Sequence, residues 1–189
     1  MSLIPFGFWA ASGAGGGAAA YELIETVTLA NNTTPTVTFS SIPADYKHLQ
    51  IRASVQSSNS NSLDDVMTLT MNGNASAIYT WHWLEGTGSS VSSAGYTARN
   101  YIRIDTIDTA RYGSLSFTPV VMDILDYANT SKNTTVRYLH GDRGQGTQRI
   151  KLASGLYQAT NAVTSMTFTG SLAGYNFNAG SRLSLYGVK

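Results

Sequence analysis

Residues 49–55 read LQIRASV, and the alternation in this stretch decides the fold class. Leu49, Ile51, Ala53 and Val55 are apolar or small, and the residues between them are polar. Successive side chains of a β-strand point to opposite faces, so this pattern is expected of a strand whose sheet buries one face. The stretch therefore predicts an antiparallel sheet with one side packed against a core.

Other segments of the same kind extend over the rest of the chain. They are short, rich in β-branched and aromatic residues, and separated by turn-forming residues. The predicted strands are Tyr21–Leu29, Thr36–Phe39, Leu49–Val55, Val66–Met71, Tyr79–Leu84, Tyr101–Ile104, Leu115–Asp126, Thr134–Leu139, Arg149–Tyr157, Val163–Phe168 and Leu183–Val188. Between two of them, Asn72-Gly73 predicts a two-residue hairpin turn. The only helix expected after residue 20 is a single turn near Pro43–Tyr46.

Many short strands in one chain of 189 residues predict an all-β, antiparallel β-sandwich over residues 21–189. We expect a jelly-roll-like arrangement, with an immunoglobulin-like sandwich as the alternative. The composition agrees, because Ser, Thr and Asn make up 56 of the 189 residues and favour turns and pleated surfaces over helix interiors.

The composition also excludes several kinds of chemistry. Without cysteine the chain has no disulfides, thiolate metal sites or thiol nucleophiles. A net charge of +1 provides no general attraction for nucleic acid, and no apolar run is long enough for a membrane span. His48, His82 and His140 have no metal-ligand spacing, and no nucleophile elbow is present. We therefore expect no cofactor, no metal and no enzymatic activity.

Charge is divided unevenly along the chain. Residues 1–129 hold five Lys/Arg and ten Asp/Glu, whereas residues 130–189 hold seven Lys/Arg and one acid, Asp142. Either complementary faces meet between subunits, or the two halves attract each other within one fold. The second interpretation is favoured, because sequence halves of a sandwich interleave in space.

Residues 1–20 form a separate segment, an extended arm of aromatic residues followed by Gly and Ala, without any charge. Ile4, Phe6, Phe8 and Trp9 predict a docking segment that becomes ordered on a partner. The alternative is that Ile4 to Trp9 pack back on the domain as an edge strand.

Two further features are candidate contact sites. In the segment Tyr79–Leu84, alternation places Tyr79, Trp81 and Trp83 on one face, where they form either a platform for sugar rings or another subunit, or part of the core. Arg143 lies in a Gly-rich loop and could pair with an anion, although a plain hairpin loop is the favoured interpretation.

Several phrases of the sequence resemble a known family. They are IPFGFWAASGAGGGAA, YELIETVTL, VTFSSIPADYKHLQIR, MNGNASAIYTWHWLEGTGSSVSS and SRLSLYGVK, and together they span the chain from end to end. They are similar to small virion structural proteins of tailed bacteriophages, found in marine and cyanobacterial phages and often labelled virion structural or tail fibre proteins. The resemblance implies a place on the particle and carries no catalytic motif.

These observations lead to two hypotheses. The first is a non-enzymatic accessory capsid protein, of decoration or cement type, attached to other virion proteins through its arm and assembled as a symmetric homo-oligomer such as a trimer. The second is a short tail fibre or appendage that recognises a host surface glycan. Both place the chain in the virion, and the absence of cysteine fits assembly in the reducing host cytoplasm.

Overall fold

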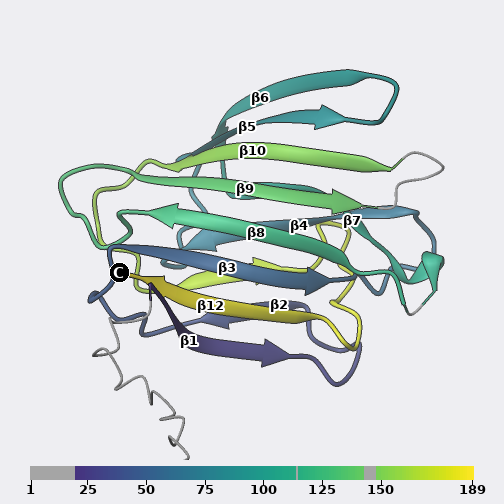
Figure 1. Cartoon of the computed structure of the whole chain (residues 1–189), viewed down its shortest axis with the longest axis horizontal. Helices are drawn as coiled ribbons and strands as arrows, with labels where there is room; N and C mark the ends of the chain where they lie inside the picture. Colours follow the sequence, from purple (N-terminus) through teal and green to yellow (C-terminus); the bar gives the residue numbers. More distant parts are fainter. Residues whose placement is uncertain (1–19, 114, 143–147) are drawn as a thin grey trace, which may run out of the picture.

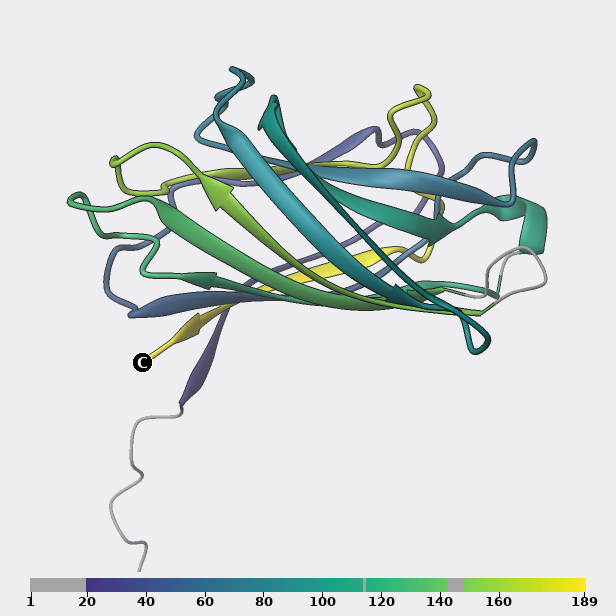
Figure 2. The same ribbon diagram turned by 90° about the horizontal axis from the view of Figure 1, so that it is seen from above.

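The computed structural model describes residues 20–113, 115–142 and 148–189. In these residues two antiparallel sheets pack face to face (Figures 1 and 2). The strands are β1 (Tyr21–Thr28), β2 (Thr36–Phe39), β3 (His48–Val55), β4 (Asp64–Met71), β5 (Tyr79–Gly86), β6 (Val91–Arg99), β7 (Ile102–Asp108), β8 (Thr118–Leu125), β9 (Thr134–Asp142), β10 (Arg149–Tyr157), β11 (Met166–Thr169) and β12 (Arg182–Val188). The predicted all-β sandwich is confirmed.

The strand order is that of a jelly roll with an extension. The larger sheet has the order β1-β12-β3-β8-β9-β10-β5-β6, and the smaller one has the order β2-β11-β4-β7. Strands β1-β12-β3-β8 and β2-β11-β4-β7 make the two four-stranded sheets of a jelly roll, in which the first strand pairs with the last. Two inserted pairs, β5-β6 and β9-β10, then widen one sheet to eight strands. Figure 1 shows this widened sheet face-on.

The core lies between the sheets and follows the alternation predicted from the sequence. Leu49, Ile51 and Val55 of β3 are fully buried, while Arg52 is exposed. From the smaller sheet, Phe39 and Phe168 pack edge to face with ring centres 6.3 Å apart. The inward residues of both sheets therefore make one continuous hydrophobic layer.

Three local predictions were wrong. Asn72 and Gly73 do adopt left-handed backbone conformations, but their turn carries the chain from β4 in the small sheet to β5 in the large one instead of closing a hairpin. The helical turn expected at Pro43–Tyr46 is absent from the described structure, and a 3-10 turn forms at Ala110–Tyr112. Strand β6, rich in Ser, Gly and Ala, was not predicted, because its exposed residues give no apolar alternation.

Tyr79 joins the two sheets through its hydroxyl. The ring is buried and stacks on Tyr157 with centres 5.2 Å apart. The hydroxyl accepts a hydrogen bond from the Met71 amide at 2.9 Å and donates one to the Asn74 carbonyl at 2.8 Å. Burial raises the pKa of this phenol to about 12, so it stays protonated at physiological pH.

Tyr79→Phe is expected to lower the free energy of unfolding by about 1–3 kcal/mol, because the buried Met71 amide would lose its partner. Urea denaturation measures the change. Tyr21→Phe is the matched control, since its ring is exposed and the substitution should be nearly neutral. Equal stabilities of the two variants would contradict the role of the Tyr79 hydroxyl.

Candidate interaction surface

The outer face of the widened sheet carries a row of exposed apolar side chains. Val121 of β8 pairs with Leu139 of β9, Leu139 pairs with Leu152 of β10, and Leu152 pairs with Leu84 of β5. Each side chain points away from the core and is between 44% and 51% exposed. Because directly paired residues of neighbouring strands lie on the same face, these four make an unbroken central row across four strands.

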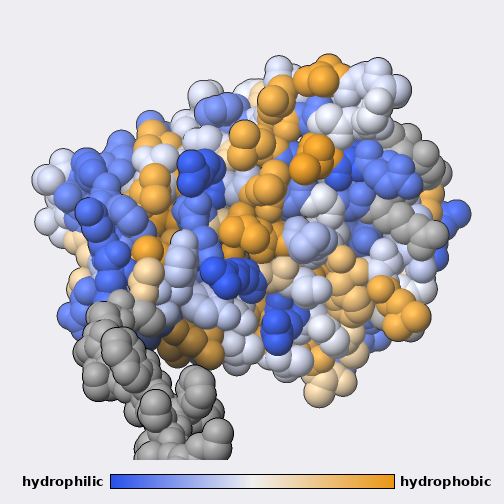
Figure 3. All heavy atoms as spheres, in the orientation of Figure 1, coloured by the Kyte–Doolittle hydropathy of each residue, from blue (hydrophilic) through white to orange (hydrophobic). Residues whose placement is uncertain are grey.

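A second apolar group widens this row on one side. Ile150 pairs with Gly141 and Gly86, and Gly86 pairs with Val91. The glycines contribute no side chain, so the surface is hollowed between Ile150, Val91 and the leucines. We call these six side chains the apolar stripe: Leu84, Val91, Val121, Leu139, Ile150 and Leu152. In Figure 3 hydrophobic residues form a band over this part of the sheet.

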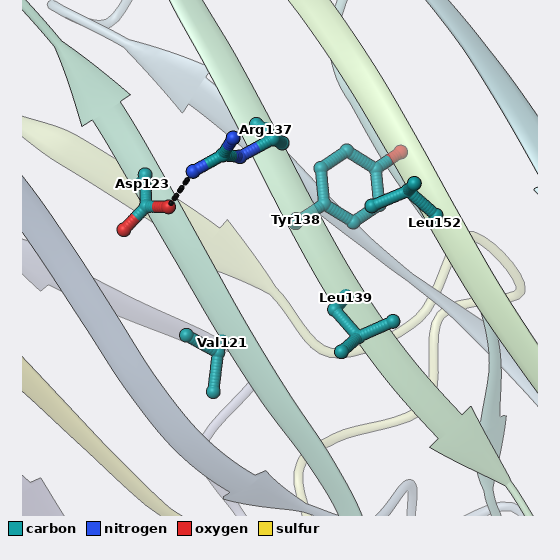
Figure 4. Close-up of a pocket in the computed structure, with 6 residues that line it drawn as sticks. All are labelled: Val121, Asp123, Arg137, Tyr138, Leu139 and Leu152. Carbon is teal, nitrogen blue, oxygen red and sulfur yellow. Dashed lines mark hydrogen bonds and ion pairs between the residues drawn. The ribbon is translucent and has the colours of Figure 1, made fainter.

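Polar side chains border the apolar stripe on its other side. Asp123 of β8 and Arg137 of β9 are paired across the strands, with Arg137 Nη2 2.9 Å from Asp123 Oδ2. Figure 4 shows this ion pair beside Val121, Leu139 and Leu152. Burial by itself would raise the pKa of Asp123, but hydrogen bonds from Gln50 and Arg137 lower it, so the carboxylate stays ionised. An apolar centre with a polar rim is the composition of a protein–protein contact surface.

This surface was not predicted, although the sequence contains a signal for it. In β10, Ile150 and Leu152 point outward while Ala153 and Tyr157 point into the core. When both the odd and the even positions of an antiparallel strand carry apolar residues, both faces of the sheet are expected to be covered. The strand was predicted, but this second apolar face was not interpreted.

The aromatic residues proposed as a platform lie on the inner face of β5, one of the strands that carry the stripe. Tyr79 and Trp81 are buried, and Trp81 packs on Tyr96 with ring centres 4.2 Å apart. Trp83 is partly buried and packs against the core. The core alternative therefore holds for Tyr79 and Trp81, because the inner face of β5 lies against β7 of the smaller sheet. The two rings do not provide an exposed surface on which a sugar could stack.

The inner face next to Trp83 contains a buried charge cluster. Lys151 of β10 has its Nζ 2.8 Å from Glu85 Oε2 and 3.9 Å from Asp105 Oδ2, and it lies 4.7 Å from the centre of the Trp83 ring. Asp105 also pairs with Arg103 of the same strand. The cluster joins β5, β7 and β10, so its charges connect the extension to the smaller sheet.

His140 is a buried neighbour of this cluster. Within the described residues neither of its ring nitrogens has a hydrogen-bond partner. Burial, together with the positive charge of Lys151, lowers the pKa of His140 to about 3. The imidazole is therefore neutral in the folded protein at physiological pH.

Acid is expected to destabilise the fold through His140. Its pKa is lower folded than unfolded, so between about pH 6.5 and 3 the unfolded chain binds the additional proton and stability falls as pH falls. The expected loss from pH 7 to pH 5 is on the order of 2 kcal/mol by this linkage. Burial raises the pKa of Asp142, so this carboxyl group opposes the trend as the pH falls through its folded-state pKa.

Urea denaturation of the wild type and of His140→Gln at pH 7 and pH 5 measures the contribution of His140 to the pH dependence of stability. The quantity of interest is the change in unfolding free energy of each protein between the two pH values. A variant that is less stable at both pH values therefore remains informative. The variant should lose clearly less stability than the wild type over this interval. The same loss in both proteins would contradict the account.

The oppositely charged parts of the sequence form ion pairs with each other within the fold. Basic residues of the second part pair with acids of the first in six ion pairs among the described residues: Lys132 with Asp126, Arg137 with Asp123, Arg149 with Asp64, Lys151 with both Glu85 and Asp105, and Lys189 with Glu22. Some of the pairs lie between neighbouring strands or loops, and those of Arg149 with Asp64 and Lys151 with Asp105 join the two sheets. The favoured interpretation, attraction between the halves of one fold, is therefore confirmed for these residues.

The remaining candidate residues are placed as follows. Ile4, Phe6, Phe8, Trp9 and Arg143 lie outside the described residues. Among the residues that the structure describes, no three His, Asp or Glu side chains gather in a way that could hold a metal ion. No helix of the described chain is long and apolar enough to span a bilayer.

No protein-family model and no curated protein matches this chain.

Proposed function

We propose that the chain is a non-enzymatic structural subunit of a tailed-bacteriophage particle, an accessory capsid-decoration module. It packs against other virion subunits through the apolar stripe, and residues 1–20 serve as its attachment arm. The observation that carries the proposal is the central row of Val121, Leu139, Leu152 and Leu84, each about half exposed on the outer face of the larger sheet.

Leaving this apolar face in water costs free energy. Contiguous apolar patches on the surface of a soluble protein mark contact sites or make the protein aggregate. The apolar stripe spans five neighbouring strands and contains no charged side chain. Burying it against a neighbouring subunit removes apolar area from water, which is the main favourable term in association.

The resemblance to phage virion proteins supports a place in the phage particle, and the exposed apolar stripe supports packing against a neighbouring subunit. The alternative, a tail fibre or appendage that binds glycans, has less support because Tyr79 and Trp81 are in the core. A wide, shallow apolar face fits a protein surface better than a sugar, which needs polar partners as well as an aromatic ring.

The test is the copy number of the chain in purified particles of the phage that encodes it, measured by quantitative mass spectrometry against the major capsid protein. Hundreds of copies per particle are expected for a capsid-decoration module. A few to tens of copies would favour the tail alternative, and absence from particles would contradict both.

A further inference from the structure

The apolar stripe has no partner among the described residues. A second apolar part of the chain is the aromatic segment near the N-terminus, in which Ile4, Phe6 and Phe8 alternate with other residues and which lies outside the described residues. We infer that, before assembly, this segment lies across the central row of its own chain, with Phe8 near Val121 and Ile4 near Leu84. The inference rests on the proposed function in that assembly then replaces the segment with a neighbouring subunit.

The lengths of the two apolar parts agree. The central row crosses from β8 to β5, which is three strand spacings or about 14 Å. In an extended chain, Ile4, Phe6 and Phe8 point to the same side, and the first and last are about 14 Å apart. An extended segment laid across the strands would therefore place its three apolar side chains along the whole central row.

The chemistry of the two parts also agrees. Residues 1–20 contain no charged side chain, and neither does the apolar stripe. The glycines Gly86 and Gly141 beside the stripe leave space for large rings, since they carry no side chain on the outer face. The ion pair of Asp123 with Arg137 limits the apolar surface on the opposite side. Burying uncharged rings on the stripe therefore does not remove water from any charged side chain.

The chain can also reach this place. Through its partners in β12 and β3, Tyr21 lies level with Leu125 of β8. Val121 lies four residues further along β8, about 14 Å, and β8 is three strands from β1, again about 14 Å. The direct distance from Tyr21 to Val121 is therefore about 20 Å.

The intervening sequence matches that distance. Phe8 and Tyr21 are 13 residues apart, and a Gly-rich chain of this length has a root-mean-square span of about 20 Å. The effective concentration of a tethered segment is greatest when its average span equals the distance to its site. For this reason the segment of the same chain is favoured over that of a second copy at low protein concentration.

The consequence is a subunit that protects its own contact surface. While the segment covers the stripe, neither apolar part is free to aggregate. During assembly both are released together, the stripe to a neighbouring subunit and the segment to its docking partner. Contact with the particle and exposure of the arm would then be one coupled step.

Disulfide trapping tests the inference cleanly because the chain has no cysteine of its own. The variant Phe6→Cys/Leu139→Cys is oxidised mildly at low concentration, and the cross-link is identified by mass spectrometry. The matched control is Phe6→Cys/Thr135→Cys: Thr135 lies on the same strand and the same face as Leu139 but closer to the level of Tyr21. Mixing two differently tagged forms separates cross-links within a chain from those between chains.

We expect a cross-link within one chain that forms at least about tenfold faster for Leu139 than for Thr135. Equal rates for the two positions would mean that the segment has no preferred site and would overturn the inference. Cross-links mainly between differently tagged chains would assign the stripe to a neighbour's arm and would also overturn it. The copy-number measurement is independent, so trapping within the chain together with absence from particles would refute the proposed function alone.

Discussion

Replacing Leu139 and Leu152 with lysine is expected to reduce incorporation of the chain into particles more than tenfold while leaving its fold intact. The two side chains are about half exposed, so the substitution costs within about 1 kcal/mol of folding free energy. Packed against another subunit, however, two unpaired ammonium groups would be desolvated, at several kcal/mol. A loss of about 1.4 kcal/mol in contact free energy already weakens binding tenfold.

The measurement is the ratio of variant to wild-type chain in particles purified from cells that express both. The matched control is Thr38→Lys/Thr167→Lys, a pair of neighbouring side chains on the outer face of the smaller sheet. The control should be incorporated like the wild type. If the stripe variant is incorporated normally, the stripe is not the contact surface.

Lys151→Ala is expected to lower the free energy of unfolding by about 3–5 kcal/mol, the largest stability effect in the chain that we foresee. The ammonium group is nearly inaccessible to solvent and is the charge partner of the partly buried Glu85. Removing it leaves Glu85 without its counter-charge and weakens the environment of Asp105, while the Trp83 ring loses its cation.

Lys132→Ala provides the control for this prediction. Lys132 pairs with the carboxylate of Asp126, but its side chain is 56% exposed. An exposed pair of this kind contributes between about 0 and 1 kcal/mol. Urea denaturation of both variants at pH 7 compares the two environments directly, and similar losses in the two would show that burial of the charge cluster has no energetic consequence.

The fold could be predicted from local pattern wherever one face of a strand is apolar and the other polar. LQIRASV of β3 is such a case, and the strands Thr36–Phe39 and Arg149–Tyr157 have the predicted bounds. Strand β6 could not be found in this way, because an edge strand of Ser, Gly and Ala is held by main-chain pairing with β5 and not by buried side chains. The hairpin predicted at Asn72-Gly73 was wrong because the type of a turn does not decide which sheet the next strand joins.

The interaction surface depends on register, and register is a property of the whole sheet. Leu84 and Val121 are 37 positions apart in the sequence and become ends of one row only because β9 and β10 are inserted between their strands. The burial of Tyr79 and Trp81 depends likewise on the position of β7, which no local pattern specifies. Alternation correctly grouped the rings on one face, but only the tertiary arrangement decides which face is buried.

In the assembled particle, another virion subunit is expected to cover the apolar stripe. Electron cryomicroscopy of the particle at side-chain resolution would show this contact. Atoms of a neighbouring subunit should lie within about 4.5 Å of the Leu139 and Leu152 side chains. A reconstruction in which this face of the sheet points into bulk solvent would contradict it.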